Sequence, residues 1–406
     1  MRDIFFDDSA DIQELESLLK KGYNINSYNE DYITPLFKAN AEKTRLFLKY
    51  GADPFKNKFN KEDDVFFYTI KDESLPVEDL KEKINALIEY GVDINKLYRE
   101  QKNILFFCRN DIALFLIEKN PDLMKQINFN GENILFRKDL SIELFKYYVE
   151  NGVNVNHIKT WDESVLDANY HSLEKLEILL ENGADPNYVT NKHPLYIWDN
   201  NINDENYFYK LIKLFEKFKF DFKNLNPNME TPLFVARNTK EVNLLLKLGV
   251  DMNQVNAKMH GSETAIIYNC LCSRYGSALA LMKKGADLEL YNKENGTLII
   301  NVFNSKLVNE FINMGGDVNY VNQFNENALH NMNTNKDELK KLMFLLENGI
   351  DVYNKSTRTG LSGIDALPSN LKEVALKYTI KKEREIIESS IIDEKINKNN
   401  INKKRL

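Results

Sequence analysis

The chain alternates short amphipathic segments with polar turns. In one typical segment, Ile84, Leu87 and Ile88 stand seven, four and three positions before Gly91. This spacing places the three apolar side chains on one face of a helix, and a glycine just past the last turn adopts the left-handed conformation that ends many helices. The same slot recurs at Gly22, Gly51, Gly91, Gly152, Gly183, Gly249, Gly285, Gly315 and Gly349, and we expect Asn120 and Phe218 to fill it in two degenerate copies.

These anchors are periodic. Eleven of them lie between Gly22 and Gly349, at a mean spacing of about 33 residues, which is typical of stacked structural repeats. An aspartate follows the anchor by two positions, as in Asp93, and an asparagine by four, as in Asn95. Such side chains bond nearby backbone amides in turns, so a hairpin-like connection is expected after each helix. The fixed offset makes these aspartates architectural and not a catalytic series.

A helix-start signal follows the turn. Thr34 and Thr231 are each followed by proline, which combines a capping residue with one suited to the first helical turn and predicts a short first helix. Period, glycine, aspartate and Thr-Pro motif together resemble the ankyrin repeat, over residues 3–360. Thr34 precedes Gly51 by 17 positions, against 21 from Thr264 to Gly285, so several copies should lack about one turn of the first helix.

The resemblance implies an all-α fold, an ankyrin-type solenoid of about eleven helix-turn-helix repeats with short β-hairpin fingers and terminal capping helices. We expect an N-terminal capping repeat at 1–30 and a repeat array at 31–360, with a bend possible near 199–225. C-terminal capping helices at 361–394 and a basic disordered tail at 395–406 should follow. The inserted segments 71–76 and 199–206 are rich in turn formers and are expected to form loops.

Composition narrows the class of protein. The 406 residues are 43% hydrophobic and 28% charged with a net charge of -7, so the chain can bury a core and stay soluble at neutral pH. The acidic balance argues against a nucleic-acid partner, except weakly through the basic tail. The start of the chain lacks the apolar stretch of a signal peptide, and no apolar run is long enough to cross a bilayer. Three cysteines form no disulfide framework, so we expect a cytoplasmic protein, of the producing cell or of a host cell.

The sequence offers no catalytic constellation. Its five histidines are scattered over different repeats, and neither His-Glu-x-x-His nor Cys-x-x-Cys spacing occurs. Glycine-rich phosphate-binding motifs do not occur either, so we expect no catalytic residue, no cofactor and no metal site. Cys270 and Cys272 lie two apart on a predicted helix and so face different directions, which predicts that one thiol is buried and inert.

A variable surface remains as the candidate for function. The position after the asparagine slot differs between repeats, and large side chains there and nearby are suited to binding hot spots. The partner-binding candidates are Lys96, His157, Trp161, Tyr188, Gln254, Tyr291 and Tyr320. By the resemblance, the concave face formed by the fingers and the first helices would grip another protein.

The expected function is therefore a non-enzymatic scaffold that blocks or sequesters a protein partner. Asparagine- and lysine-rich chains of this kind resemble bacterial or phage-encoded ankyrin proteins, for which a host-directed effector or an inhibitor of a defence enzyme is the implied role. The alternative is a regulatory subunit or an enzyme with activity in residues 200–230 or 360–406, where the repeat is weakest. The sequence leaves the partner's identity and the oligomeric state open, and a second copy of the chain is one candidate.

Overall fold

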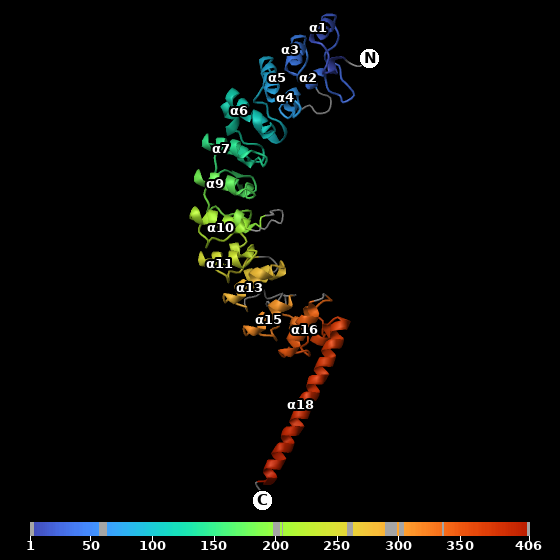
Figure 1. Cartoon of the computed structure of the whole chain (residues 1–406), viewed down its shortest axis with the longest axis vertical. Coiled ribbons are helices and arrows are strands. Elements are labelled where there is room, and N and C mark those ends of the chain that lie inside the picture. Colours follow the sequence, from blue (N-terminus) through green and yellow to red (C-terminus); the bar gives the residue numbers. More distant parts are fainter. Residues whose placement is uncertain are drawn as a thin grey trace. The chain divides into compact units, whose positions relative to one another are not determined.

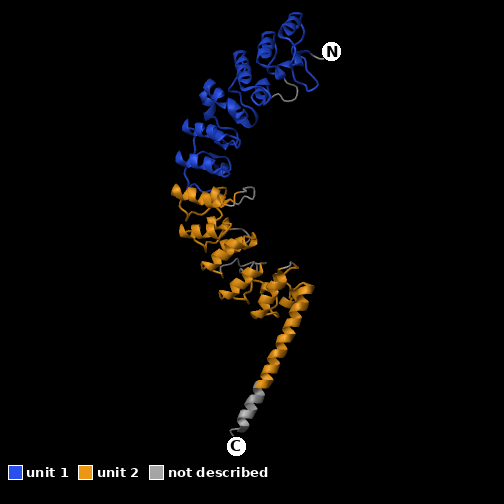
Figure 2. Ribbon diagram, viewed as in Figure 1, with its two compact units in different colours: residues 1–190 blue, residues 191–406 orange. Residues whose placement is uncertain are grey.

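The computed structural model describes residues 4–56, 63–197, 204, 206–257, 263–288, 299, 304–334 and 337–403, with side chains as far as residue 392. The chain divides into two compact units, residues 1–190 and residues 191–406 (Figure 2). Both units are mostly helical, as the all-α prediction requires.

Unit 1 is a succession of helix pairs, each with a short first helix and a longer second one (Figure 1). Its elements are η1 (Ile4–Phe6), α1 (Ile12–Lys20), α2 (Pro35–Lys38), α3 (Ala41–Lys49), α4 (Val65–Thr69), α5 (Val77–Glu89), η2 (Arg99–Gln101), η3 (Ile104–Phe106), α6 (Asn110–Lys119), η4 (Pro121–Lys125), η5 (Ile134–Phe136), α7 (Ile142–Glu150), β1 (Ile158–Lys159), β2 (Glu163–Ser164), α8 (Val165–Ala168) and α9 (Leu173–Glu181), where η marks a 3-10 helix. The second helices pack in order, α3 on α5, α5 on α6, α6 on α7 and α7 on α9.

Unit 2 continues the same scheme. Its elements are η6 (Pro194–Tyr196), α10 (Tyr207–Lys217), η7 (Pro232–Phe234), α11 (Thr239–Lys247), α12 (Ala265–Leu271), α13 (Tyr275–Lys283), α15 (Ser305–Asn313), η8 (Ala328–Asn331), α16 (Glu338–Glu347), α17 (Gly363–Ala366) and α18 (Ser369–Lys403). The second helices again pack in order, from α10 through α11, α13, α15 and α16 to the start of α18. Each unit is therefore an ankyrin-like stack in which an element contacts its sequence neighbours.

The glycine anchors end their helices as predicted. All nine have φ between +81° and +89°, the left-handed region that glycine adopts without strain. The aspartate two positions later closes a turn, and Asp185 Oδ1, for example, accepts the backbone N–H of Asn187 at 2.8 Å. The predicted turn-closing role is confirmed for six aspartates, namely Asp53, Asp93, Asp185, Asp251, Asp317 and Asp351.

The two degenerate anchors differ from the prediction. Asn120 has an extended backbone, with φ of -150°, and caps helix η4 by accepting the N–H of Asp122, because the proline that follows it disfavours a helical or left-handed residue there. Phe218 is not the anchor either. The left-handed residue is Lys219, with φ of +60°, and Asp221 closes the turn two positions later.

Asparagines of the finger turns connect neighbouring repeats. The Asn156 side chain donates to Gly183 O at 2.8 Å and accepts the N–H of Asp185 at 2.7 Å. Asn26 makes the equivalent pair of bonds to Gly51 and Asp53. These bonds span 25 to 29 residues, so the asparagine acts between repeats and not only within its own turn.

The first helices are short, and the next repeat satisfies their carbonyl groups. Helix α2 has 4 residues and α12 has 7, which confirms the missing turn. Thr34 and Thr231 stand at the N-cap positions, yet neither makes the side-chain cap bond that the sequence predicted. The backbone carbonyl groups at the ends of these short helices have no partner within the helix. They accept hydrogen bonds from buried cationic side chains of the following repeat. The pairs are Lys83 Nζ with Phe37 O, Arg137 Nη1 with Leu105 O, and Arg274 Nη1 with Phe234 O.

Apolar residues on the second-helix faces form the core of each unit. Phe47, Phe145 and Phe311 are buried, whereas Phe115 is half-buried. Residues 71–76 form the predicted loop, while most of 199–206 lies outside the described residues. Helix α18 runs to Lys403, so residues 395–403 are helical where the sequence predicted a disordered tail.

Candidate functional site

Several of the described fingers are closed at the base by an asparagine side chain. In the finger at 128–132, the N–H of Asn128 donates to Glu132 O at 3.0 Å, and Asn128 Oδ1 accepts the N–H of Glu132 at 2.9 Å. Gly131 supplies the left-handed residue that this tight loop requires. The same closure recurs at Asn226–Glu230 and Asn322–Glu326. Local sequence therefore fixes the finger tips.

Backbone bonds join successive fingers. In unit 1, the N–H of Phe129 donates to Glu100 O at 2.8 Å, and the N–H of Thr160 donates to Asn130 O at 3.1 Å. In unit 2, the N–H of Thr357 donates to Phe324 O at 2.8 Å. These bonds hold neighbouring tips in a defined register, so their side chains form a preorganised surface.

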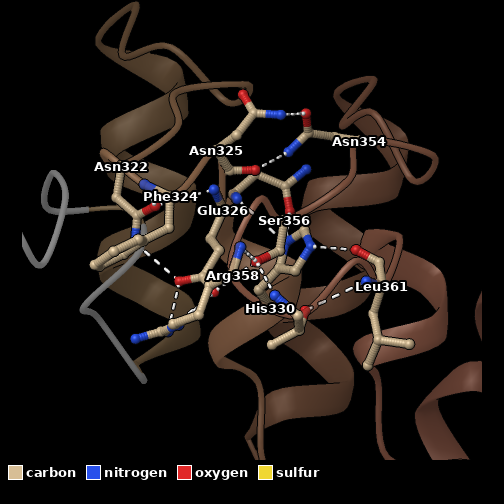
Figure 3. A network of polar contacts seen from close by, with 11 residues as sticks. Asn322, Phe324, Asn325, Glu326, His330, Asn354, Ser356, Arg358 and Leu361 are labelled. Carbon is tan, nitrogen blue, oxygen red and sulfur yellow. Dashed lines mark hydrogen bonds and ion pairs between the residues drawn. The ribbon is translucent and has the colours of Figure 1, made fainter.

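Ion pairs at the finger bases reinforce this register. The nearly buried Glu326 receives Arg358 Nη2 at 2.8 Å, Ser356 Oγ at 3.0 Å and Asn322 Nδ2 at 3.0 Å (Figure 3). Burial raises the pKa of Glu326, but these hydrogen bonds outweigh it and hold the pKa below its usual value. Lys159 with Glu132, at 3.1 Å, is a similar pair in unit 1.

Trp161 and Tyr188, two of the predicted partner-binding residues, lie on adjacent fingers. Trp161 is at the tip of the β1–β2 hairpin, where Ile158 pairs with Ser164 and Lys159 with Glu163, and 85% of its surface is exposed. Tyr188, on the next finger, donates its Oη–H to Asp162 Oδ1 at 2.5 Å. This hydrogen bond raises the pKa of the Tyr188 phenol. The structure thus brings two predicted aromatic residues onto one surface.

Lys96 and His157 hold fingers in place. Lys96 Nζ pairs with the buried carboxylate of Asp64 at 2.7 Å. His157 is half-buried, its Nε2 lies 2.6 Å from Gly131 O, and its ring packs edge-on against Phe136. Both side chains therefore form contacts between neighbouring repeats.

Of the other three candidates, two lie among the described residues. Gln254 and Tyr320 are half-buried residues of unit 2, and the Gln254 side chain donates to the adjacent Val255 O. Tyr291 lies outside the described residues. Contact of any of the seven with a partner remains a prediction.

Sequence reasoning missed other exposed apolar residues on the same fingers. Phe129 is 72% exposed, and Leu97 and Ile158 are also exposed. We define the fingertip surface as Leu97, Phe129, Ile158, Trp161 and Tyr188. The sequence signal that would have found Phe129 is its place between Asn128 and Gly131, inside a tight turn that leaves its side chain no core to enter.

Two hollows adjoin the fingers in unit 1. A cavity of about 280 Å³ is lined by Val155, Ile158, Leu166, Asp185 and Tyr188, among others. A groove of about 640 Å³ runs over the first helices, with Phe37, Phe67 and Tyr68 among its apolar lining and Lys38, Asp72 and Arg99 among its charged residues. Both offer concave contact area beside an exposed aromatic surface.

Buried ionisable groups of the array have structural roles. Asp167 caps helix α8 and accepts Thr190 Oγ1 at 3.0 Å. Burial, partly offset by these hydrogen bonds, raises its pKa to about 6. Burial raises the pKa of Cys108 to about 11, which keeps this thiol protonated. Cys270 is buried and Cys272 is exposed, which confirms that only one of the two thiols is enclosed.

Within the described ranges, no three His, Cys, Asp or Glu side chains are grouped so as to hold a metal ion. None of the helices described combines the length and the apolar character needed to cross a membrane.

Neither a protein-family model nor a curated protein sequence matches the chain. Solved structures do match. The ankyrin repeat domain of Bcl-3 is 15% identical, with 58% of this chain and 91% of that chain covered and a TM-score of 0.37. An ankyrin repeat domain from Acinetobacter baumannii is 19% identical, with 42% and 92% covered and a TM-score of 0.35.

A third match is the structure of a predatory endopeptidase from Bdellovibrio bacteriovorus in complex with an immunity protein. It is 22% identical, covers 43% of this chain and 88% of that chain, and has a TM-score of 0.34. Structural matches to ankyrin repeat domains thus exist for this chain at low sequence identity.

Proposed function

We propose that this chain is a non-enzymatic scaffold that binds a partner protein through the fingers and first helices, with the fingertip surface of unit 1 as the principal contact. The observation that carries the proposal is Trp161. Its side chain is 85% exposed and its backbone has φ of +78°. A non-glycine residue in this region is strained by roughly 1–3 kcal/mol, and an exposed indole returns no burial energy to the free protein. Binding would supply that burial.

The neighbours of Trp161 fit the same role. Phe129 and Tyr188 add aromatic area on adjacent fingers, and Trp and Tyr are enriched at the centres of interfaces. The bonds from Phe129 to Glu100 and from Thr160 to Asn130 hold these tips before a partner arrives, which lowers the entropy lost on binding. The groove over the first helices extends the contact area.

In its finer form, the proposal is that binding blocks or sequesters the partner, as a host-directed effector or an inhibitor of a defence enzyme would. A regulatory subunit or an enzyme with activity in residues 200–230 or 360–406 stays the alternative. If the partner is an enzyme, its activity should fall as the chain is added in stoichiometric amounts.

The test compares two double variants of the full chain. Trp161→Ala with Phe129→Ala removes the fingertip aromatics, whereas Tyr90→Ala with Leu114→Ala removes two exposed residues at the end of α5 and on α6 as a matched control. Proteins retained by the wild-type chain from the source cell are identified by mass spectrometry, and the affinity of a purified one is then measured.

The fingertip variant should bind the partner at least about a hundredfold more weakly, because hot-spot truncations each cost roughly 2 kcal/mol or more, although the two costs need not add. The control variant should bind like the wild type, and circular dichroism should show both variants folded. Unchanged affinity of a folded fingertip variant would refute this surface as the contact.

A further inference from the structure

The cavity of about 280 Å³ beside Tyr188 has a mixed lining of apolar side chains, the polar Asn156 and Ser164, and one acidic residue. Val155, Ile158, Leu166 and the Tyr188 ring supply the apolar surface, and Asp185 contributes a carboxylate. The volume is several times that of a water molecule, about 30 Å³, so the cavity has room for a side chain. Ile158 and Tyr188 also belong to the fingertip surface, which makes the cavity part of the proposed contact.

A second carboxylate lies next to the cavity. Asp162 accepts the Tyr188 Oη–H through Oδ1, and Asp185 accepts the N–H of Asn187 through Oδ1. Within the described part of unit 1, neither carboxylate forms an ion pair, and Oδ2 of each makes no hydrogen bond. The lysine of the same hairpin, Lys159, is held by Glu132 and Glu163 at 3.1 and 3.3 Å, so it does not neutralise them.

We propose that this cavity receives a lysine or arginine side chain of the partner protein. The inference rests on the proposed function and specifies its chemistry. The aliphatic stem of such a side chain packs against Val155, Ile158 and Leu166, and its cationic end meets Asp185, Asp162 and the face of Tyr188. A neutral apolar side chain would leave two carboxylates desolvated without a partner, and an acidic one would meet like charge.

Charge can be removed here without breaking the turn. Asn24 and Asn154 occupy the slot of Asp185 in other repeats and accept the same backbone N–H, each at 2.9 Å. Asp185→Asn therefore keeps the turn, and Asp162→Asn suits the left-handed backbone of residue 162, with φ of +54°. The double variant tests charge alone. Asp53→Asn with Asp93→Asn is the matched control, because both residues close the same kind of turn on other fingers.

The probe is a random peptide library displayed on phage, selected on the immobilised full chain. Selected peptides are synthesised, and each basic residue is replaced in turn, arginine by citrulline and lysine by norleucine. Affinities are measured for the wild type, the two charge variants and Trp161→Ala. We expect peptides with a basic residue beside apolar residues. Both the peptide substitution and the Asp162→Asn, Asp185→Asn pair should weaken binding at least about tenfold, against less than about twofold for the control pair.

The outcomes separate this inference from the proposed function. Peptides that depend on Trp161 but carry no basic residue, or that tolerate loss of the two carboxylates, would overturn the cavity assignment and leave the fingertip surface intact. Peptides that bind regardless of Trp161 and of the two carboxylates would overturn both.

Discussion

Lys83 offers a quantitative test of how the repeats are joined. It lies on α5 with its side chain buried, and its Nζ donates to Phe37 O of the preceding repeat at 3.2 Å. Burial lowers the pKa of this ammonium from 10.5 to about 8, with a small opposing effect from Asp72. The charged form is thus disfavoured in the folded state relative to the unfolded state.

The sign of the pH dependence follows from that shift. A base whose folded pKa is lowered binds fewer protons when folded, so its contribution to stability is fully present above pH 10.5 and is lost as the pH falls through about 8. At about 1.36 kcal/mol per pKa unit, wild-type stability should gain about 2 kcal/mol from this group between about pH 7 and about pH 9.5.

The Lys83→Met variant isolates this effect. Methionine has similar length and no charge, so the variant lacks the pH-dependent contribution. It also leaves Phe37 O without its donor, which should destabilise by about 1–3 kcal/mol at every pH. The difference in unfolding free energy between wild type and variant should therefore move by about 2 kcal/mol in favour of the wild type over this pH range.

Urea unfolding of the full chain, followed by circular dichroism, measures the difference at each pH. Hydrogen exchange of α3 and α5 then assigns it to this repeat boundary. Lys81→Met, on the same helix with a partly exposed side chain, supplies the baseline for loss of one lysine. A difference that stays flat with pH, or moves in favour of the variant, would refute the assignment of a buried ammonium to this site.

Four further changes test the repeat architecture. Gly183→Val should destabilise the chain by roughly 1–3 kcal/mol. The cause is left-handed backbone strain alone, because an added Cβ meets nothing within 4 Å. Gly276→Ala lies on a helix without positive φ and should stabilise the chain by up to about 1 kcal/mol in the same urea assay. Asn156→Ala removes two bonds to the next repeat and should cost about 1–3 kcal/mol, with hydrogen exchange rising first near residues 154–190; uniform loss of protection along the chain would contradict nearest-neighbour coupling. Truncation after residue 394 should leave the melting temperature nearly unchanged. The reason is that, among the described side chains of α18, only Leu371 and Ala375 are buried. A large fall in melting temperature would show that the end of this helix packs against the rest of the chain.

Much of the fold follows from local sequence because the interactions that specify it are short-range. A helix-ending glycine and an aspartate two residues later act within one turn, so Gly183 and Asp185 are recognisable without tertiary information. The sequence analysis placed the helix-ending left-handed residue at Phe218, one position before Lys219 where it lies. A lysine rarely adopts this conformation, so the residue type gave no indication of it. Asp221, two positions further, was the usable evidence.

The contacts between repeats were decided by tertiary structure. Asn156 reaches Gly183 across 27 residues, and Lys83 reaches Phe37 across 46, distances over which no local pattern specifies a partner. The same holds for the candidate surface. The sequence identified Trp161 and Tyr188 as aromatic residues at variable positions, but only the stacked fingers bring them together and expose Phe129 beside them. His157 was equally variable, yet the fold turns it towards Gly131 O, because burial and partners depend on the neighbouring repeat and not on the residue's own turn.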